Sequence, residues 1–344
     1  MPKLSSLEDL QALRDRILND YDPDKPRIVI SAGSCGLASG ADDVQRLVKR
    51  YLLEKGLLDR VSLRIIGCIG FCEMGPSILA QPMGAFYPKV KADDIPRIID
   101  ATLEKEVVEE LLYKDPVTSE ICKSQGDIAF FKKQKRTVMG RNQELDPIRM
   151  YNYLAAGGYK GLARAMEKND PAWVVDEVKT SKLRGRGGAG FPTGVKWELA
   201  ARQDSKRGKY VVCNADEGDP GAYMDRAILE GNPHSVIEGM IIAGLGMGAT
   251  EGVIFVRYEY PLAIKHSLIA LRLAREYGLL GEDILGRGLN FDINVVQSAG
   301  AFVCGEETAL IRTIEGYMGE PRQRPPYPIE RGIHGLPTCI NNVE

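Results

Sequence analysis

The stretch from residue 211 to residue 221 reads Val-Val-Cys-Asn-Ala-Asp-Glu-Gly-Asp-Pro-Gly. Its β-branched start is typical of a strand, and four polar side chains follow: Asn214, Asp216, Glu217 and Asp219. An Asn amide can pair with the amide edge of a heterocycle, and carboxylates accept hydrogen bonds from sugar hydroxyls. This pattern indicates a ligand site at the carboxyl end of a strand. The alternative is an acidic turn with Asx caps and no ligand.

The residues around this stretch predict an α/β domain that spans 147–344. Strands are predicted at 209–213, 252–258 and 291–296, and helices after Pro261 and over 306–315. Strands that alternate with helices form a mainly parallel sheet, and ligands bind at the carboxyl ends of its strands.

A glycine-rich segment precedes the first of these strands. Residues 183–192 read Leu-Arg-Gly-Arg-Gly-Gly-Ala-Gly-Phe-Pro, and Gly185, Gly187 and Gly190 satisfy G-x-G-x-x-G. Glycines let backbone N–H groups approach a phosphate, and Arg186 and Lys196 add positive charge. The residues before this segment look helical, so a first-turn Rossmann loop is not favoured. A flexible surface loop is the alternative.

Three further segments carry polar groups. Residues 299–308 follow a strand and open a helix, with Glu306 and Glu307 in its first turn, where they could simply cap it. Residues 322–328, Arg-Gln-Arg-Pro-Pro-Tyr-Pro, form a rigid segment with one aromatic ring. Residues 338–344 read Thr-Cys-Ile-Asn-Asn-Val-Glu.

The first part of the chain predicts a smaller α/β domain. Residues 1–24 read as a charged helical segment, and residues 25–105 run strand, helix, strand, strand, strand, helix. That order suits a thioredoxin-like domain. Residues 106–146 are predicted to be a connector that lies on a neighbouring surface. Its basic run, 130–136, is typical of a solvated face.

Composition excludes several classes of protein. The chain has 344 residues and a net charge of −2, which argues against a dedicated nucleic-acid binder. No apolar stretch is long enough to span a membrane, and the charged N-terminus lacks a signal peptide, which favours the cytoplasm. Seven cysteines, an odd number, make disulfides unexpected, and three scattered histidines do not support a zinc site.

Taken in order, the five segments resemble one family over residues 108–344. The matching runs are 185–194, 214–221, 304–310 and 341–344, together with the Pro-rich segment. They resemble the NADH-oxidising flavoprotein subunit of respiratory complex I and its relatives in NAD-linked and electron-bifurcating hydrogenases and formate dehydrogenases. The resemblance implies a Rossmann-like FMN- and NADH-binding domain. It also implies an oxidoreductase that passes hydride from NADH to FMN and electrons singly to iron–sulfur clusters, and needs no general base.

The same resemblance implies roles for individual residues. FMN would be held by Gly185, Arg186, Gly187, Gly188, Ala189, Lys196, Asn214, Asp216, Glu217, Glu306, Ile340, Asn341 and Asn342. NADH would be held by Phe191, Asp219, Glu307, Arg324 and Tyr327. Phe302 stands where complex I members have an aromatic hydroxyl, so that polar role is lost. Asp219 stands for the Glu common in complex I and matches the hydrogenase branch.

The N-terminal domain resembles a thioredoxin-like [2Fe–2S] domain. Cys35, Cys68 and Cys72 offer three cluster ligands, but Ile30 occupies the position of the fourth. Two alternatives stay open: a cluster with a substitute ligand, or a cluster-free docking domain. The other four cysteines are expected to be core or loop residues.

The resemblance also implies partners and a longer chain. Family members continue past residue 344 into a ubiquitin-like domain and a helical [4Fe–4S] domain, so a fragment is expected. Iron–sulfur subunits, including a small thioredoxin-like [2Fe–2S] subunit, are the implied partners, with no nucleic acid. A non-catalytic docking or scaffold subunit is the alternative function. Hydrogenases, formate dehydrogenases and quinone-linked complexes all use such a module, so the final acceptor stays open.

Overall fold

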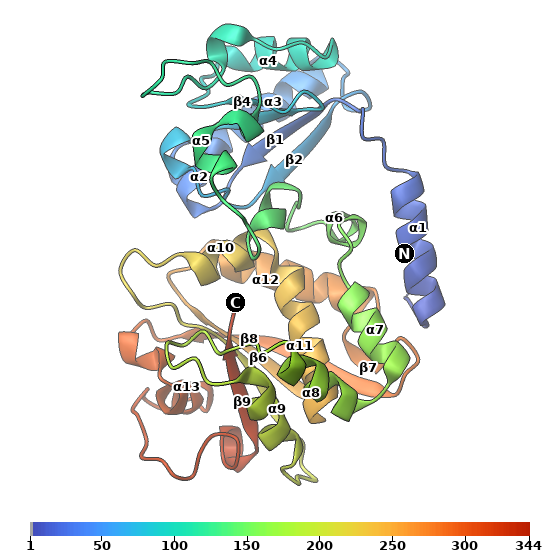
Figure 1. The fold of residues 1–344 in the computed structure, drawn as a ribbon, viewed down its shortest axis with the longest axis vertical. Coiled ribbons are helices and arrows are strands. Elements are labelled where there is room, and N and C mark those ends of the chain that lie inside the picture. Colours follow the sequence, from blue (N-terminus) through green and yellow to red (C-terminus); the bar gives the residue numbers. More distant parts are fainter. Residues whose placement is uncertain (1–2) are drawn as a thin grey trace. The chain divides into compact units, whose positions relative to one another are not determined.

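The computed structural model describes residues 3–344, so the first two residues of the predicted N-terminal segment lie outside the described residues. The chain divides into two compact units (Figure 1). The first comprises the residues up to Ile17, Tyr153–Leu229 and Pro233–Glu344. The second comprises Leu18–Asn152 and Glu230–Asn232. No helix among the described residues is long and apolar enough to cross a membrane.

The second unit is built on a four-stranded mixed sheet of order β2-β1-β3-β4. Its strands are β1 (Arg27–Ser31), β2 (Ser62–Ile66), β3 (Ile78–Gln81) and β4 (Ala85–Tyr87). Its helices are α2 (Ser34–Ala38), α3 (Ala41–Glu54), α4 (Asp94–Leu103) and α5 (Ala129–Lys132), with 3-10 turns η1 (Cys72–Met74), η2 (Glu109–Leu111), η3 (Gln125–Asp127) and η4 (Gly140–Gln143). β1 pairs parallel with β2 and antiparallel with β3. This is the thioredoxin-like topology that the order of elements predicts.

Alternation along β1 divides the core of this unit between two faces. Ile28 and Ile30 point into one cluster with the apolar sides of α3 and α4, and Val29 points into the other. The connector covers that second face. Phe130 stacks on Phe71 with ring centroids 4.5 Å apart. The aromatic half of the basic run therefore packs on a neighbouring surface, as predicted, while the lysines between Phe131 and Arg136 are exposed.

The first unit contains a five-stranded sheet of order β7-β8-β6-β5-β9 (Figure 1). Its strands are β5 (Tyr210–Ala215), β6 (Glu251–Arg257), β7 (Gly281–Ile284), β8 (Leu289–Ser298) and β9 (Thr338–Asn342). β8, β6, β5 and β9 run parallel, and only β7 is antiparallel. The prediction of a mainly parallel sheet is confirmed.

The other regular elements of this unit are helices. They are α1 (Leu7–Asn19), α6 (Met150–Ala155), α7 (Lys160–Lys168), α8 (Pro171–Thr180), α9 (Thr193–Ala201), α10 (Met224–Gly231), α11 (Pro233–Met247), α12 (Pro261–Glu276) and α13 (Glu307–Ile314), with 3-10 turns η5 (Phe302–Gly305) and η6 (Ile333–Gly335); α1, α6 and α10 each cross a boundary between the units. α11 packs against β5, β6 and β8, and its length is almost entirely buried because most of its residues are apolar.

The chain order of the parallel strands creates a switch point. β5 comes first, β6 and β8 are added on one side, and β9 returns to pair with the other side of β5. Crossovers on opposite sides of one strand leave a crevice at its carboxyl end, which is where such sheets bind ligands.

Candidate functional site

A cavity of about 1100 Å³ opens at the carboxyl ends of β5 and β9. Every residue that the sequence predicted for FMN and for NADH lines it, from the glycine loop, β5, the start of α13, the Pro-rich segment and β9. The structure thus brings together segments that lie more than 150 residues apart, since Gly185 and Asn342 share one wall.

Backbone hydrogen bonds join the two ends of the glycine loop, and among the described residues those between the two ends make none through their N–H groups. The Gly185 N–H donates to the Phe191 carbonyl at 2.8 Å, and the Thr193 N–H donates to the Leu183 carbonyl at 2.9 Å. Among residues 3–344, no acceptor is found for the backbone N–H groups from 186 to 190. Gly188 and Gly190 have φ values of 96° and 62°, a region that side-chain-bearing residues avoid. Unpaired N–H groups on such a loop fit a phosphate.

Lys196 places an ammonium beside this loop. Lys196 lies in the first turn of α9, and its Nζ donates a hydrogen bond to the Ile340 carbonyl at 2.7 Å. An ammonium has three donors, so two stay available to a ligand. A Cβ at Gly187 would lie 3.1 Å from Asn342 Oδ1, so a side chain at this position would crowd the end of β9. These residues fit the phosphate end of FMN.

The end of β5 supplies a polar pair. Asn214 Nδ2 donates to the Gly305 carbonyl at 2.9 Å, and its Oδ1 accepts the Asp216 N–H at 3.0 Å. Both carboxylate oxygens of Asp216 are buried, with no hydrogen-bond partner found in the described part of the chain. Burial raises the pKa of Asp216, and the nearby Ser298 hydroxyl opposes that rise only in part. A buried acceptor without a partner is costly, and a ligand hydroxyl or ring N–H would satisfy it.

Two of the predicted cofactor residues also cap helices. Glu306 accepts from the Thr308 and Ala309 N–H groups at 2.9 and 3.0 Å, at the N-terminus of α13. Glu217 accepts from the N–H groups of Asp225 and Arg226, each at 3.2 Å, at the start of α10. The capping alternative is therefore confirmed for Glu306, although both carboxylates also line the cavity.

The opposite end of the cavity is more open. Phe191 and Tyr327 are 50% and 53% exposed, so their rings are available to an aromatic ligand. Arg324 forms an ion pair with Glu307, which links the Pro-rich segment to α13. Asp219 lines the same region.

The cavity also has lining residues that the sequence analysis missed, among them Leu199, Gln203, Met224 and Asp225. Leu199 lies three positions after Lys196 on the same face of α9, so helical spacing could have found it, whereas Gln203 lies just beyond the end of that helix. No pattern in the sequence marks Asp225. Burial, with the charges of Glu217 and Glu344, raises its pKa to about 7.

The raised pKa of Asp225 predicts a pH-dependent stability. Between about pH 4 and pH 7 the unfolded chain loses the Asp225 proton while the folded chain keeps it, so the free energy of unfolding falls as pH rises. A shift from 3.8 to about 7 corresponds to roughly 4 kcal/mol. We expect Asp225→Asn, in flavin-free protein, to stabilise at pH 8 but hardly at pH 4, as measured by urea unfolding. The exposed control Asp176→Asn should show no such trend, and parallel profiles for Asp225→Asn and wild type would contradict the assignment.

The three predicted cluster cysteines meet in the second unit. Cys68 Sγ lies 3.5 Å from Cys72 Sγ, and the Gly70 N–H lies 3.2 Å from Cys68 Sγ. The hydrogen bond with Cys68, burial and the nearby Cys35 raise the pKa of Cys72. Ile30, at the position of the fourth ligand, is 0% exposed in the core. Within residues 3–344 no group of three or more His, Cys, Asp or Glu side chains is placed to hold a metal ion. These residues do not fit a cluster with four cysteine ligands.

Comparison with known proteins identifies the cavity-bearing part of the chain. Residues 178–344 match the family described as the Nuo51 FMN-binding domain. The match covers just under half of the chain. The glycine loop, β5, α13, the Pro-rich segment and β9 all lie within the matched range.

Similar proteins are found among curated and solved proteins. The NADP-reducing hydrogenase subunit HndC of Solidesulfovibrio fructosivorans is 56% identical over 62% of this chain and 43% of its own length. One subunit of the NADH-quinone oxidoreductase of Aquifex aeolicus is 48% identical over 56% of this chain and 44% of its own length. A crystal structure of an air-oxidized NAD+-reducing [NiFe]-hydrogenase is 25% identical, with a TM-score of 0.49, and covers 97% of this chain and 53% of that one. The chain spans less than half the length of the two curated relatives.

Proposed function

We propose that the chain is the NADH-oxidising, FMN-binding part of a multi-subunit oxidoreductase. It transfers hydride between NAD(H) and FMN and passes electrons singly to iron–sulfur clusters in partner subunits. One observation carries this proposal: a single cavity joins the N–H groups of the glycine loop, the Lys196 ammonium and the buried Asp216 carboxylate. Within residues 3–344 no acceptor is found for N–H groups 186–190, and no well-formed hydrogen bond is found to the Asp216 carboxylate. The relatives support it, because one is named as part of an NADH-quinone oxidoreductase and the other as part of an NADP-reducing hydrogenase.

Bound FMN supplies the redox chemistry, because a flavin accepts hydride from a nicotinamide and can release electrons one at a time. The residues of the chain bind the flavin and NADH and orient them relative to each other. The glycine loop and Lys196 hold the flavin phosphate, and Asp216 accepts from a flavin hydroxyl or ring N–H. The rings of Phe191 and Tyr327 hold the adenine of NADH. Hydride transfer needs no proton abstraction by the protein, so no general base is assigned.

The iron–sulfur clusters and partner subunits of the proposed complex lie outside the cofactor cavity. The three-thiol site in the second unit lacks a fourth cysteine, and no electron step is assigned to it. A [4Fe–4S] cluster is proposed in a longer form of the chain, and iron–sulfur subunits, including a small thioredoxin-like [2Fe–2S] subunit, are the proposed partners. Within residues 3–344 none of the seven cysteines is in a disulfide, which suits a reducing compartment, so we place the protein in the cytoplasm.

Flavin reconstitution tests the proposal. The chain should bind FMN stoichiometrically, and anaerobic NADH should bleach the flavin absorbance. Absence of FMN binding would reject the proposal. It would favour the alternative of a non-catalytic docking subunit, which the buried Ile30 in place of a cluster ligand also favours.

Phe191→Ala should raise the KM for NADH about tenfold and leave kcat little changed. The ring lies half exposed at the end of the glycine loop, and an aromatic stack with a base contributes about 1–3 kcal/mol. Binding energy that is equal in ground and transition states affects KM alone. Steady-state turnover with an artificial acceptor measures both constants. Leu268→Ala removes an exposed apolar side chain from α12 and serves as control; equal KM values for the two variants would refute the role of Phe191.

A further inference from the structure

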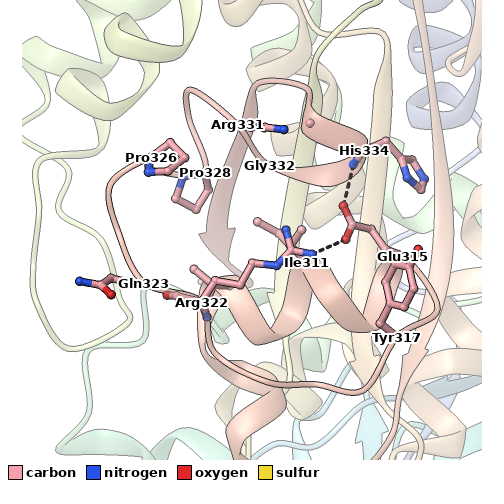
Figure 2. A pocket seen from close by; sticks show the side chains of 12 residues that line it. Ile311, Glu315, Tyr317, Arg322, Gln323, Pro326, Pro328, Arg331, Gly332 and His334 are labelled. Carbon is pink, nitrogen blue, oxygen red and sulfur yellow. Dashed lines mark hydrogen bonds and ion pairs between the residues drawn. The ribbon is translucent and has the colours of Figure 1, made fainter.

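A second cavity, of about 540 Å³, lies between the Pro-rich segment, α13 and the η6 turn (Figure 2). Its walls are one side of α13 from Thr308 to Glu315, the Pro-rich segment and the η6 turn that precedes β9. Pro328 lines both this cavity and the cofactor cavity. The two cavities therefore have Pro328 in common but are lined by different charged groups.

The charge balance of this second cavity is positive. Arg322, Arg331 and His334 line it, and Glu315 is the one carboxylate among its described lining residues. Glu315 is already engaged: it accepts from Arg322 Nη2 and from the His334 backbone N–H, each at 2.8 Å (Figure 2). Neither the Arg331 guanidinium nor the His334 imidazole has an ion-pair or hydrogen-bond partner within residues 3–344. Arg331 and His334 are both exposed at the wall of this cavity, so among the described residues a permanent cation and a ring N–H donor are left to solvent or to a ligand.

The backbone at His334 adds an independent observation. His334 has φ 51° and ψ 28°, a left-handed conformation that glycine adopts without cost, and it is followed by Gly335 at φ 74°. A side chain in this region costs roughly 1 kcal/mol, and such residues concentrate at ligand sites. Glu315 holds this conformation by accepting the His334 N–H. The fold therefore maintains a histidine at a position where glycine would be less strained.

We propose that this second cavity binds a small phosphorylated anion. Arg331 provides the fork geometry that matches phosphate oxygens, and His334 provides a second donor. The volume exceeds that of a single phosphate group, which fits an anion the size of a diphosphate or a small phosphate ester. This site goes beyond the proposed hydride transfer, because none of its charged residues lines the cofactor cavity.

Calorimetric titration with inorganic pyrophosphate tests the proposal on the FMN-loaded chain. Saturating NAD+ is present, so that the cofactor cavity is filled and pyrophosphate binding there is suppressed. We expect one binding site, and we expect Arg331→Gln to weaken it about tenfold or more, because a hydrogen bond to a charged group is lost. Arg16→Gln, which removes an exposed arginine from α1, should leave the affinity unchanged.

His334→Gly separates binding from folding. It relieves the left-handed strain, so the melting temperature should be maintained, while pyrophosphate binding weakens severalfold. Weakened binding in both variants with intact melting and an intact NADH KM would support the site. No detectable binding, binding that NAD+ abolishes, or equal affinities in Arg331→Gln and Arg16→Gln would overturn it.

Discussion

Lys196→Met should weaken FMN binding by about 10- to 100-fold. Methionine keeps the length and the packing of the lysine stem but removes the ammonium that lies beside the glycine loop. Hydrogen bonds to charged groups contribute about 1.5–3 kcal/mol, which corresponds to that range of affinity. Equilibrium dialysis or quenching of flavin fluorescence measures the dissociation constant directly.

The effect is expected to be specific to the cavity. Lys206→Met removes an exposed lysine from the turn before β5 and should change the affinity less than twofold. Gly187→Val provides a second route to the same result, because a side chain there would meet Asn342 at the end of β9. If Lys196→Met and Lys206→Met bound FMN equally well, Lys196 would not hold the phosphate.

The sequence predicted the parallel sheet and the lining of the cavity because both depend on local signals. Short apolar strands end in polar residues, and each motif lies where its strand or loop ends. The strand character of β9 was missed. Its residues, Thr338–Asn342, end in two asparagines, which have low strand propensity. Parallel pairing with β5, which aligns Asn341 with Cys213, determines the structure there. At this position, where the order in which strands are added to the sheet reverses, pairing with β5 outweighs the low strand propensity of the residues.

Long-range contacts in the second unit could not be predicted from the sequence. Arg136 Nη1 donates to the Ile69 carbonyl at 2.6 Å, so one residue of the basic run holds the loop that carries Cys68 and Cys72. A Cβ at Gly67 would lie 2.4 Å from Gly231 Cα, so two glycines allow one backbone to pass against another. Nothing in the local pattern around residue 67 or residue 231 predicts this approach, because a Cβ at Gly67 would meet Gly231 and a Cβ at Gly231 would meet the Asn142 side chain, both far away in the sequence.

Glu230→Ala should lower the free energy of unfolding of the second unit by about 2–4 kcal/mol. Glu230 is only 1% exposed, and its carboxylate accepts from the Ser34 N–H at 2.8 Å and from the Ser34 hydroxyl. Alanine leaves these donors without that acceptor in a buried place, at the start of the short helix that carries Cys35. Loss of this anchor should also speed alkylation of Cys35 by maleimide, since the turn that holds it becomes free to open.

A graded series distinguishes this anchor from a general loss of packing. Glu230→Gln keeps the shape and one acceptor oxygen, so its unfolding free energy should lie between those of wild type and Glu230→Ala. Glu104→Ala, at an exposed position after α4, should change neither stability nor alkylation. Urea unfolding and timed alkylation with mass spectrometry give the two readouts. Destabilisation without faster alkylation of Cys35 would mean that Glu230 stabilises the unit through its packing. Faster alkylation of Cys35 in Glu230→Ala, and not in Glu104→Ala, would mean that the Glu230 carboxylate holds the Cys35 turn in place through Ser34, which lies 196 positions away in the sequence.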